Sequence, residues 1–70
     1  MFVFRRTVLN RRVLVNLVDG TAIGGVLTKK IGPLLRIEGP VVYGSGEPKR
    51  SDGYIVVERD RVKFVQVMSG

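Results

Sequence analysis

The chain has no cysteine and no histidine among its 70 residues. The lack of cysteine excludes disulfide bonds and thiolate metal ligands, which many small domains use to reinforce a small core. General acid or base chemistry would depend on six carboxylates, and no pattern in the sequence brings two of them together. We therefore predict that the protein is not an enzyme and uses no metal or cofactor.

Long apolar runs are also missing. No run approaches the roughly 18 residues that a bilayer-spanning helix needs. The arginines in the opening MFVFRR follow the apolar residues, whereas a signal peptide carries its basic residues first. We predict a soluble, unexported protein without a membrane partner.

The short length limits the core. A chain of 70 residues makes one domain, and it buries only about 60% of the surface that its unfolded form exposes. Its core is therefore marginal, and a partner chain is expected to help. We predict a single domain over residues 1–70, with an N-terminal segment (1–12) and a barrel (13–68).

Charge of one sign is in excess, because twelve basic residues face six acidic ones and give a net charge of +6. Such a surface attracts polyanions, since each neutralised phosphate releases counterions. The same charge also serves solubility in many small domains. The candidate nucleic-acid-binding residues are Arg5, Arg6, Arg11, Arg12, Lys29, Lys30, Arg59 and Arg61.

Apolar side chains recur at every second position, which is typical of strands with two distinct faces. Residues 13–17 and 21–28 alternate in this way around Asp19-Gly20, a pair that favours a tight hairpin turn. Gly24-Gly25 would weaken a flat strand, so we predict a sharp bend of the kind that closes a small barrel.

Three more strands follow. A connection over residues 29–33 leads to a strand at 34–42, which Gly39-Pro40 bends or ends. After a polar loop at 44–53 come strands at 54–58 and 62–68, joined by a tight turn. The predicted fold is mainly β: an SH3-like, five-stranded, bent antiparallel barrel. Residues 1–10 read either as strand or as a short helix, and we favour a helix that caps one end.

The last two strands are apolar on both faces. Such strands are usually covered on both sides, and open edges recruit partners through unpaired amides and carbonyls. A ring that joins the fourth strand of one subunit to the fifth of the next meets both needs, whereas a single intact core is the alternative interpretation. The predicted interface residues are Tyr54, Ile55, Val56, Val57, Phe64, Val65 and Val67.

Three segments resemble one known family. VLVNLVDGTAIGGVL, LLRIE and GYIVVERDRVKFV are together similar to the Sm/LSm proteins, including their bacterial Hfq branch. The resemblance covers roughly residues 13–67. It implies an N-terminal helix on a five-stranded bent barrel, and homo-oligomeric rings commonly of five to seven members.

The sequence departs from the family where RNA is read. Family members that bind uridine-rich RNA have an aromatic residue and an Asn before the third strand, and an Arg-Gly-Asp-like turn after the fourth. Here the first loop reads KKIGPLL, and Glu58 stands where the arginine would be. We predict that uridine selectivity is lost and that phosphate contacts from Lys29, Lys30, Arg59 and Arg61 remain.

Two functional hypotheses follow. In the first, a ring binds RNA or single-stranded DNA through phosphates. In the second, the chain is a structural subunit of a larger particle such as a phage virion, and its loops serve as docking surfaces. A Pro-rich peptide ligand is disfavoured because only Tyr43 and Tyr54 could form its groove. The expected location is the cytoplasm of a bacterial or phage-infected cell, or a virion.

Overall fold

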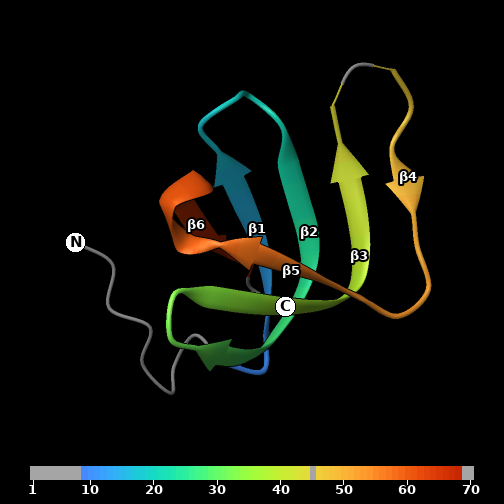
Figure 1. Cartoon of the computed structure of the whole chain (residues 1–70). Coiled ribbons are helices and arrows are strands. Elements are labelled where there is room, and N and C mark those ends of the chain that lie inside the picture. Colours follow the sequence, from blue (N-terminus) through green and yellow to red (C-terminus); the bar gives the residue numbers. More distant parts are fainter. Residues whose placement is uncertain (1–8, 45, 69–70) are drawn as a thin grey trace.

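A computed structural model of the chain describes residues 9–44 and 46–68 (Figure 1). These residues form an antiparallel sheet that bends back on itself into a small barrel. The predicted mainly β fold is confirmed, with all five predicted strands present. The elements are β1 (Arg11–Leu17), β2 (Ala22–Ile31), β3 (Leu34–Tyr43), β4 (Lys49–Arg50), β5 (Tyr54–Glu58), the 3-10 turn η1 (Arg59–Arg61) and β6 (Val62–Val67).

The N-terminal prediction is only partly within the described residues. Of the short helix favoured for residues 1–10, residues 1–8 lie outside them. Residues 9 and 10 form a turn, and Arg11 already begins β1. The barrel therefore starts two residues before the predicted boundary at Val13.

The β1–β2 hairpin forms where the Asp-Gly pair predicts it. Val13 and Val15 point into the barrel and are buried, as their alternation requires. The turn is closed by the amide of Leu17, which donates to the carbonyl of Thr21 at 2.8 Å. Gly20 has a φ of 94°, a conformation that glycine adopts without steric cost.

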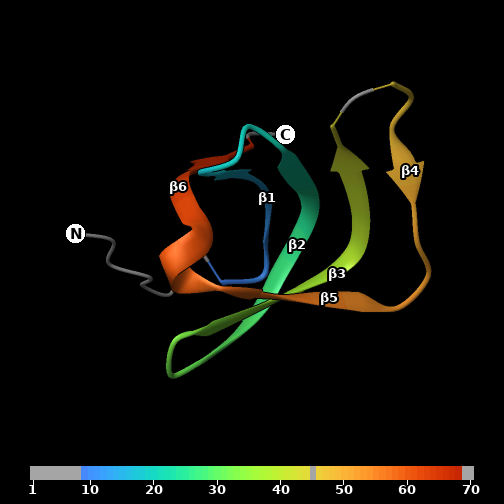
Figure 2. The same ribbon diagram turned by 45° about the horizontal axis from the view of Figure 1, so that its top comes forward.

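The strand β2 is curved along its length (Figure 2), and Gly25 is its fourth residue. The pairing register between β2 and β3 shifts at this position. A Cβ on Gly25 would lie 2.5 Å from Cγ2 of Ile37 and 2.7 Å from the carbonyl oxygen of Glu38. Only glycine lets the two strands approach this closely, which agrees with the predicted bend.

Replacing Gly25 with alanine is expected to lower the free energy of unfolding by about 1–3 kcal/mol, because the added methyl overpacks the core. The matched control is Gly44→Ala, whose new Cβ would meet only Cγ2 of Thr21, at an ordinary 3.5 Å. Chemical denaturation of both variants at equal protein concentration measures the difference. Equal midpoints would show that the close approach at Gly25 does not limit stability.

The connection predicted over residues 29–33 is too long, because β2 continues to Ile31 and β3 begins at Leu34. The two strands stay paired up to Ile31 and Leu34. Only Gly32 and Pro33 form the turn, and the φ of 56° at Gly32 suits glycine. The two lysines of this segment therefore lie on a strand and not in a loop.

The third strand passes through Gly39-Pro40 and continues to Tyr43. Gly39 takes a φ of 59°, and Pro40 is buried at this bend. The predicted loop at 44–53 contains β4, which pairs with Val41 and Val42 of β3. Two charged residues in succession show no apolar alternation, so the sequence carried no strand signal there.

The turn η1 ties both hairpins together at one place. The amide of Arg59 donates to the carbonyl of Pro33 at 2.7 Å, so η1 touches the β2–β3 turn. The amide of Val18, beyond the end of β1, donates to the carbonyl of Arg61 at 2.8 Å. β5 pairs with β3, and β6 returns to pair with β1.

The core lies inside the bent sheet and is entirely aliphatic. All five long strands contribute inward-facing residues, as alternation predicts. Burial of branched apolar side chains is the main stabilising contribution in such a small domain. The buried residues are Val13, Val15, Ile23, Leu27, Leu35, Ile37, Val57 and Val62.

Candidate nucleic-acid and subunit interfaces

β5 and β6 each pair with only one neighbour among residues 9–44 and 46–68. β5 is bonded to β3, and β6 is bonded to β1, so each strand has a second edge without a partner strand in that part of the chain. An unpaired edge offers a row of amides and carbonyls to another strand. These are the two strands for which the sequence predicted contacts between subunits.

Side chains on these two strands divide into an inner and an outer group. Tyr54 and Val56 remain 58% and 48% exposed on the outer side of β5, and Phe64 and Val67 are exposed on β6. Val57 lies in the core. Of the other predicted interface residues, Ile55 and Val65 are half-buried and pack against that core.

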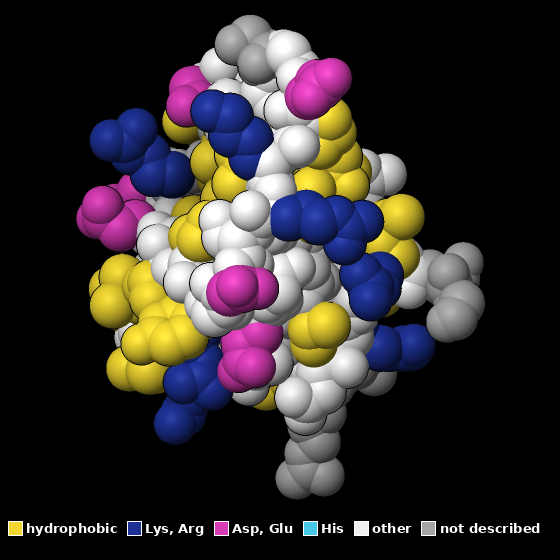
Figure 3. Space-filling view, turned by 90° about the vertical axis from the view of Figure 1, so that its right-hand side faces the viewer, with side chains coloured by type: hydrophobic (Ala, Val, Ile, Leu, Met, Phe, Trp, Pro, Cys, Tyr) yellow, Lys and Arg dark blue, Asp and Glu magenta, His cyan; other side chains and the backbone are white. Residues whose placement is uncertain are grey.

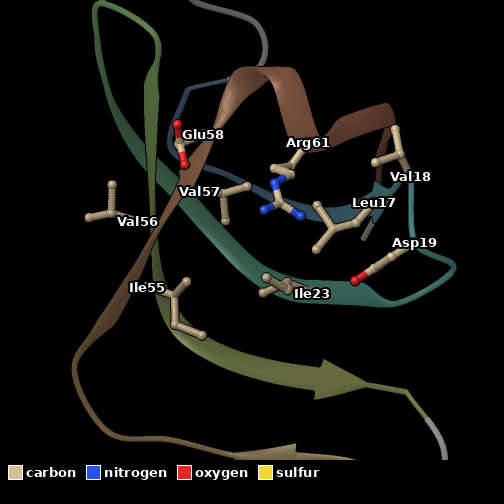
Figure 4. Close-up of a pocket in the computed structure, with 9 residues that line it drawn as sticks. All are labelled: Leu17, Val18, Asp19, Ile23, Ile55, Val56, Val57, Glu58 and Arg61. Carbon is tan, nitrogen blue, oxygen red and sulfur yellow. The ribbon is translucent and has the colours of Figure 1, made fainter.

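A pocket of about 290 Å³ opens beside the edge of β5. Its walls are mostly aliphatic, and Figure 4 shows the Arg61 side chain directed into the space near Leu17 and Val57. The same view shows Val56 pointing to the outside. The carboxylates of Asp19 and Glu58 also line the pocket, and their charge is opposite in sign to that of Arg61. The lining residues are Leu17, Val18, Asp19, Ile23, Ile55, Val56, Val57, Glu58 and Arg61.

Asp19 has a structural task at the rim of this pocket. Its Oδ1 accepts a hydrogen bond from the hydroxyl of Thr21 at 2.6 Å and one from the amide of Thr21 at 3.0 Å. These bonds, the hydroxyl contribution first, hold the pKa of Asp19 below its usual range, and the charge of Arg61 adds to the effect. The interpretation of Asp19 as a turn residue therefore agrees with the structure.

The lowered pKa gives a direction for the effect of acid. A carboxyl whose folded-state pKa is depressed stabilises the fold above its unfolded pKa of about 3.9, and this contribution is lost as the pH falls through the folded value. Thr21→Val removes the hydroxyl donor, so the pKa of Asp19 should rise toward its ordinary value. Carboxyl chemical shifts followed against pH measure this pKa. An unchanged value would show that the hydroxyl bond does not hold the carboxylate.

Three basic residues lie near the hairpin tip of β2 and β3. Lys29 and Lys30 are exposed on β2, next to the Gly32-Pro33 turn that receives the amide of Arg59. We name Lys29, Lys30 and Arg59 the basic rim. Within the described residues no carboxylate pairs with either lysine. Glu58 lies opposite Leu34 in the ladder and is the acidic group beside this rim.

The structure brings together only part of the predicted basic set. Arg61 points into the pocket of Figure 4, whose lining includes none of the other three residues predicted with it, Lys29, Lys30 and Arg59. Arg11 and Arg12 are exposed at the start of β1. Arg5 and Arg6 lie outside the described residues.

Sequence reasoning did not single out Arg36. Arg36 donates from Nε to the hydroxyl of Thr28 at 3.1 Å, lies 3.2 Å from a carboxylate oxygen of Glu38, and stacks 5.3 Å from the ring centre of Tyr54. Both charged groups of the ion pair are substantially exposed, so the pair adds little stability. In the sequence, Arg36 looked like any outward residue of an alternating strand.

Two further findings concern the part of the chain that the structure describes. No group of three or more Asp and Glu residues is placed there to hold a metal ion. The described residues also contain no helix long and apolar enough to cross a membrane.

Solved structures with this fold include two archaeal Sm proteins. The SmAP1 heptamer of P. aerophilum superposes with a TM-score of 0.81 and 26% identity, over 93% of this chain and 88% of that chain. A heptameric archaeal Sm protein gives a TM-score of 0.79 and 25% identity, over 91% and 94%. A chain from the NatC complex bound to CoA has a TM-score of 0.78 over 97% and 90%, and its 16% identity shows likeness of fold alone.

No protein-family profile and no curated protein matches the sequence significantly. The strand order, the bent barrel and these superpositions define a small β-barrel of the Sm type. The chain is similar to the Sm/LSm-like proteins in fold, as the resemblance in its sequence predicted. A phage origin stays a prediction.

Proposed function

We propose that the protein is a non-enzymatic, ring-forming Sm-like module that binds RNA or single-stranded nucleic acid mainly through phosphate contacts. The observation that carries the ring is the pair of strand edges on β5 and β6 without a partner strand among the described residues. The heptameric state of both archaeal neighbours supports the same assembly. Five to seven copies of this chain would form the ring.

The ring also explains the exposed apolar groups. When β5 of one copy pairs with β6 of the next, each interface is heterologous and the series closes if its rotation permits. Tyr54 and Val56, which share the outer face of β5, then lie beside the outward Phe64 of a neighbour, and the pocket at the edge of β5 is covered. A patch of exposed apolar side chains of this kind is typical of an interaction surface.

The basic rim is the proposed site of phosphate contact. Each subunit would present Lys29, Lys30 and Arg59 where the β2–β3 turn meets η1. Repetition around a ring multiplies these charges, and the net charge of +6 per chain favours polyanions generally. Sequence selectivity is not expected, because the apolar side chains exposed at the hairpin tip, Ile31 and Leu34, are aliphatic and offer no aromatic face for a base.

Titration of a labelled single strand at low and moderate salt tests this site. For the wild type, the logarithm of the binding constant should fall linearly with the logarithm of the salt concentration, since phosphate contacts release counterions. The double variant Lys29→Glu, Lys30→Glu should bind at least about tenfold more weakly, with a shallower salt slope. The matched control for Lys30→Glu alone is Lys49→Glu, which makes the same change in net charge on β4, outside the basic rim. Equal binding by the double variant and wild type would rule out the basic rim.

A structural subunit of a larger particle is the second candidate. The observation that favours it is the aliphatic hairpin tip, where Ile31 is 56% exposed beside Pro33 and Leu34. Such a tip suits docking against another protein better than reading RNA bases. A virion is one such particle, and the protein's location would then be the virion instead of the cytoplasm. An intact ring that binds no single strand at any salt concentration would favour this candidate.

A further inference from the structure

The outer face of the sheet carries a hollow that the basic rim does not include. The pairing registers align Arg50, Val41, Gly24 and Leu14 in one row across β4, β3, β2 and β1. Since directly paired residues point to the same side, this whole row faces outward. Tyr43 stands on the same face, one position further along this side of β3.

Gly24 makes the hollow because it has no side chain. A Cβ there would lie 3.3 Å from Cε2 of Tyr43 and 3.7 Å from Cδ1 of Leu14, so the tyrosine ring and the leucine form walls over a bare backbone. The pocket here is about 90 Å³, and Met68 also lines it. It is too small for an enclosed ligand, which needs roughly 300 Å³ or more, but it can receive the edge of one planar ring. We name Leu14, Gly24, Val41 and Tyr43 the outer slot.

Positive charge flanks the outer slot on two sides. Arg12 lines the hollow from β1, and Arg50 ends the row on β4. Glu38 lies in the same ladder row as Arg12, through Val26, and is 3.2 Å from Arg36. Figure 3 shows the β3–β4 side of the molecule, with Lys and Arg side chains beside apolar patches. An aromatic face between cations is suited to a base and its phosphates.

We propose that the outer slot binds one nucleobase of a single strand, with the base stacked on Tyr43 and the adjacent phosphates held by Arg12 and Arg50. Tyr43 is 42% exposed, so its ring is accessible in the subunit. Stacking accepts every base, and the site therefore adds affinity without sequence preference. The proposal rests on the proposed nucleic-acid function and adds a second contact to each subunit, separate from the basic rim.

The test is a titration of labelled oligouridylate and oligoadenylate with slot variants, each checked for its assembly mass. Tyr43→Leu keeps an apolar contact with Gly24 but removes the aromatic face, and its affinity should fall roughly five- to hundredfold with an unchanged salt slope. Tyr43→Phe should bind like wild type. Gly24→Ala fills the floor of the slot and should also weaken binding. Arg12→Gln and Arg50→Gln should instead reduce the salt slope.

The outcomes separate this site from the basic rim. If Tyr43→Leu loses affinity for the single strand while the double variant Lys29→Glu, Lys30→Glu binds normally, the outer slot is supported and the basic rim is ruled out. The opposite pattern, or equal affinities of Tyr43→Leu and Tyr43→Phe, would overturn the outer slot and leave the rim in place. Absence of binding by the wild-type protein would overturn both.

Discussion

Replacing Val56 with glutamate is expected to convert the assembly into folded monomers of 7.8 kDa. Val56 is 48% exposed in the single chain, so the carboxylate meets water there and the barrel tolerates it. In the ring the same group would be covered by β6 of a neighbour, and a buried carboxylate without a partner is strongly unfavourable. A loss of about 2–4 kcal/mol per contact would raise the dissociation constant roughly 30- to 1000-fold.

The control for this experiment is Ile31→Glu. Ile31 is similarly exposed, but it pairs with Leu34 of β3, and β3 separates it from β5. The same charge change there should leave the assembly mass unaltered. Circular dichroism of both variants establishes that the barrel is folded. A Val56→Glu protein that keeps the wild-type mass would show that the edge of β5 is not the joint between copies.

Replacing Leu35 with alanine is expected to lower the free energy of unfolding by about 2–5 kcal/mol. Leu35 is fully buried at the centre of the aliphatic core, so the substitution removes apolar contacts and leaves a cavity. Small domains have only about 5–15 kcal/mol of stability in total, and a chain of this length is expected toward the lower end of that range. The variant should therefore unfold at low denaturant concentration or at ambient temperature.

Leu34→Ala is the matched control, because Leu34 precedes Leu35 on β3 and faces outward, 36% exposed. Its substitution should cost less than about 1 kcal/mol. Denaturation curves of the two variants must be recorded at the same protein concentration, since self-association stabilises the folded state by mass action. Similar midpoints would contradict the assignment of the core to the inward face of β3.

The features that sequence predicted best are those set by local chemistry. Alternation assigned the inward faces of Val13 and Val15, and Asp19-Gly20 located the first hairpin turn. Gly25 gave the bend, because the close approach to Ile37 allows no side chain. The alternation and the Asp-Gly turn depend on neighbours along the chain, and the Gly24-Gly25 pair is a local signal even though the contact that requires glycine at position 25 is with β3.

The features that sequence missed depend on pairing with distant residues. The strand β4 exists only because Lys49 and Arg50 meet Val42 and Val41. The destination of Arg61 depends on a hydrogen bond that joins its carbonyl to the β1–β2 turn. The outer slot combines residues from three strands around Gly24. The missing side chain of Gly24 matters because the ring of Tyr43, 19 positions later in the sequence, packs beside it. No local pattern contains that information.

The mass of the wild-type protein in native buffer tests the account most directly. If the edges of β5 and β6 are completed by other copies, native mass spectrometry or sedimentation at micromolar concentration will give one discrete multiple of 7.8 kDa, expected to correspond to five to seven chains. A strict monomer at that concentration would contradict the ring and the function proposed for its basic rim.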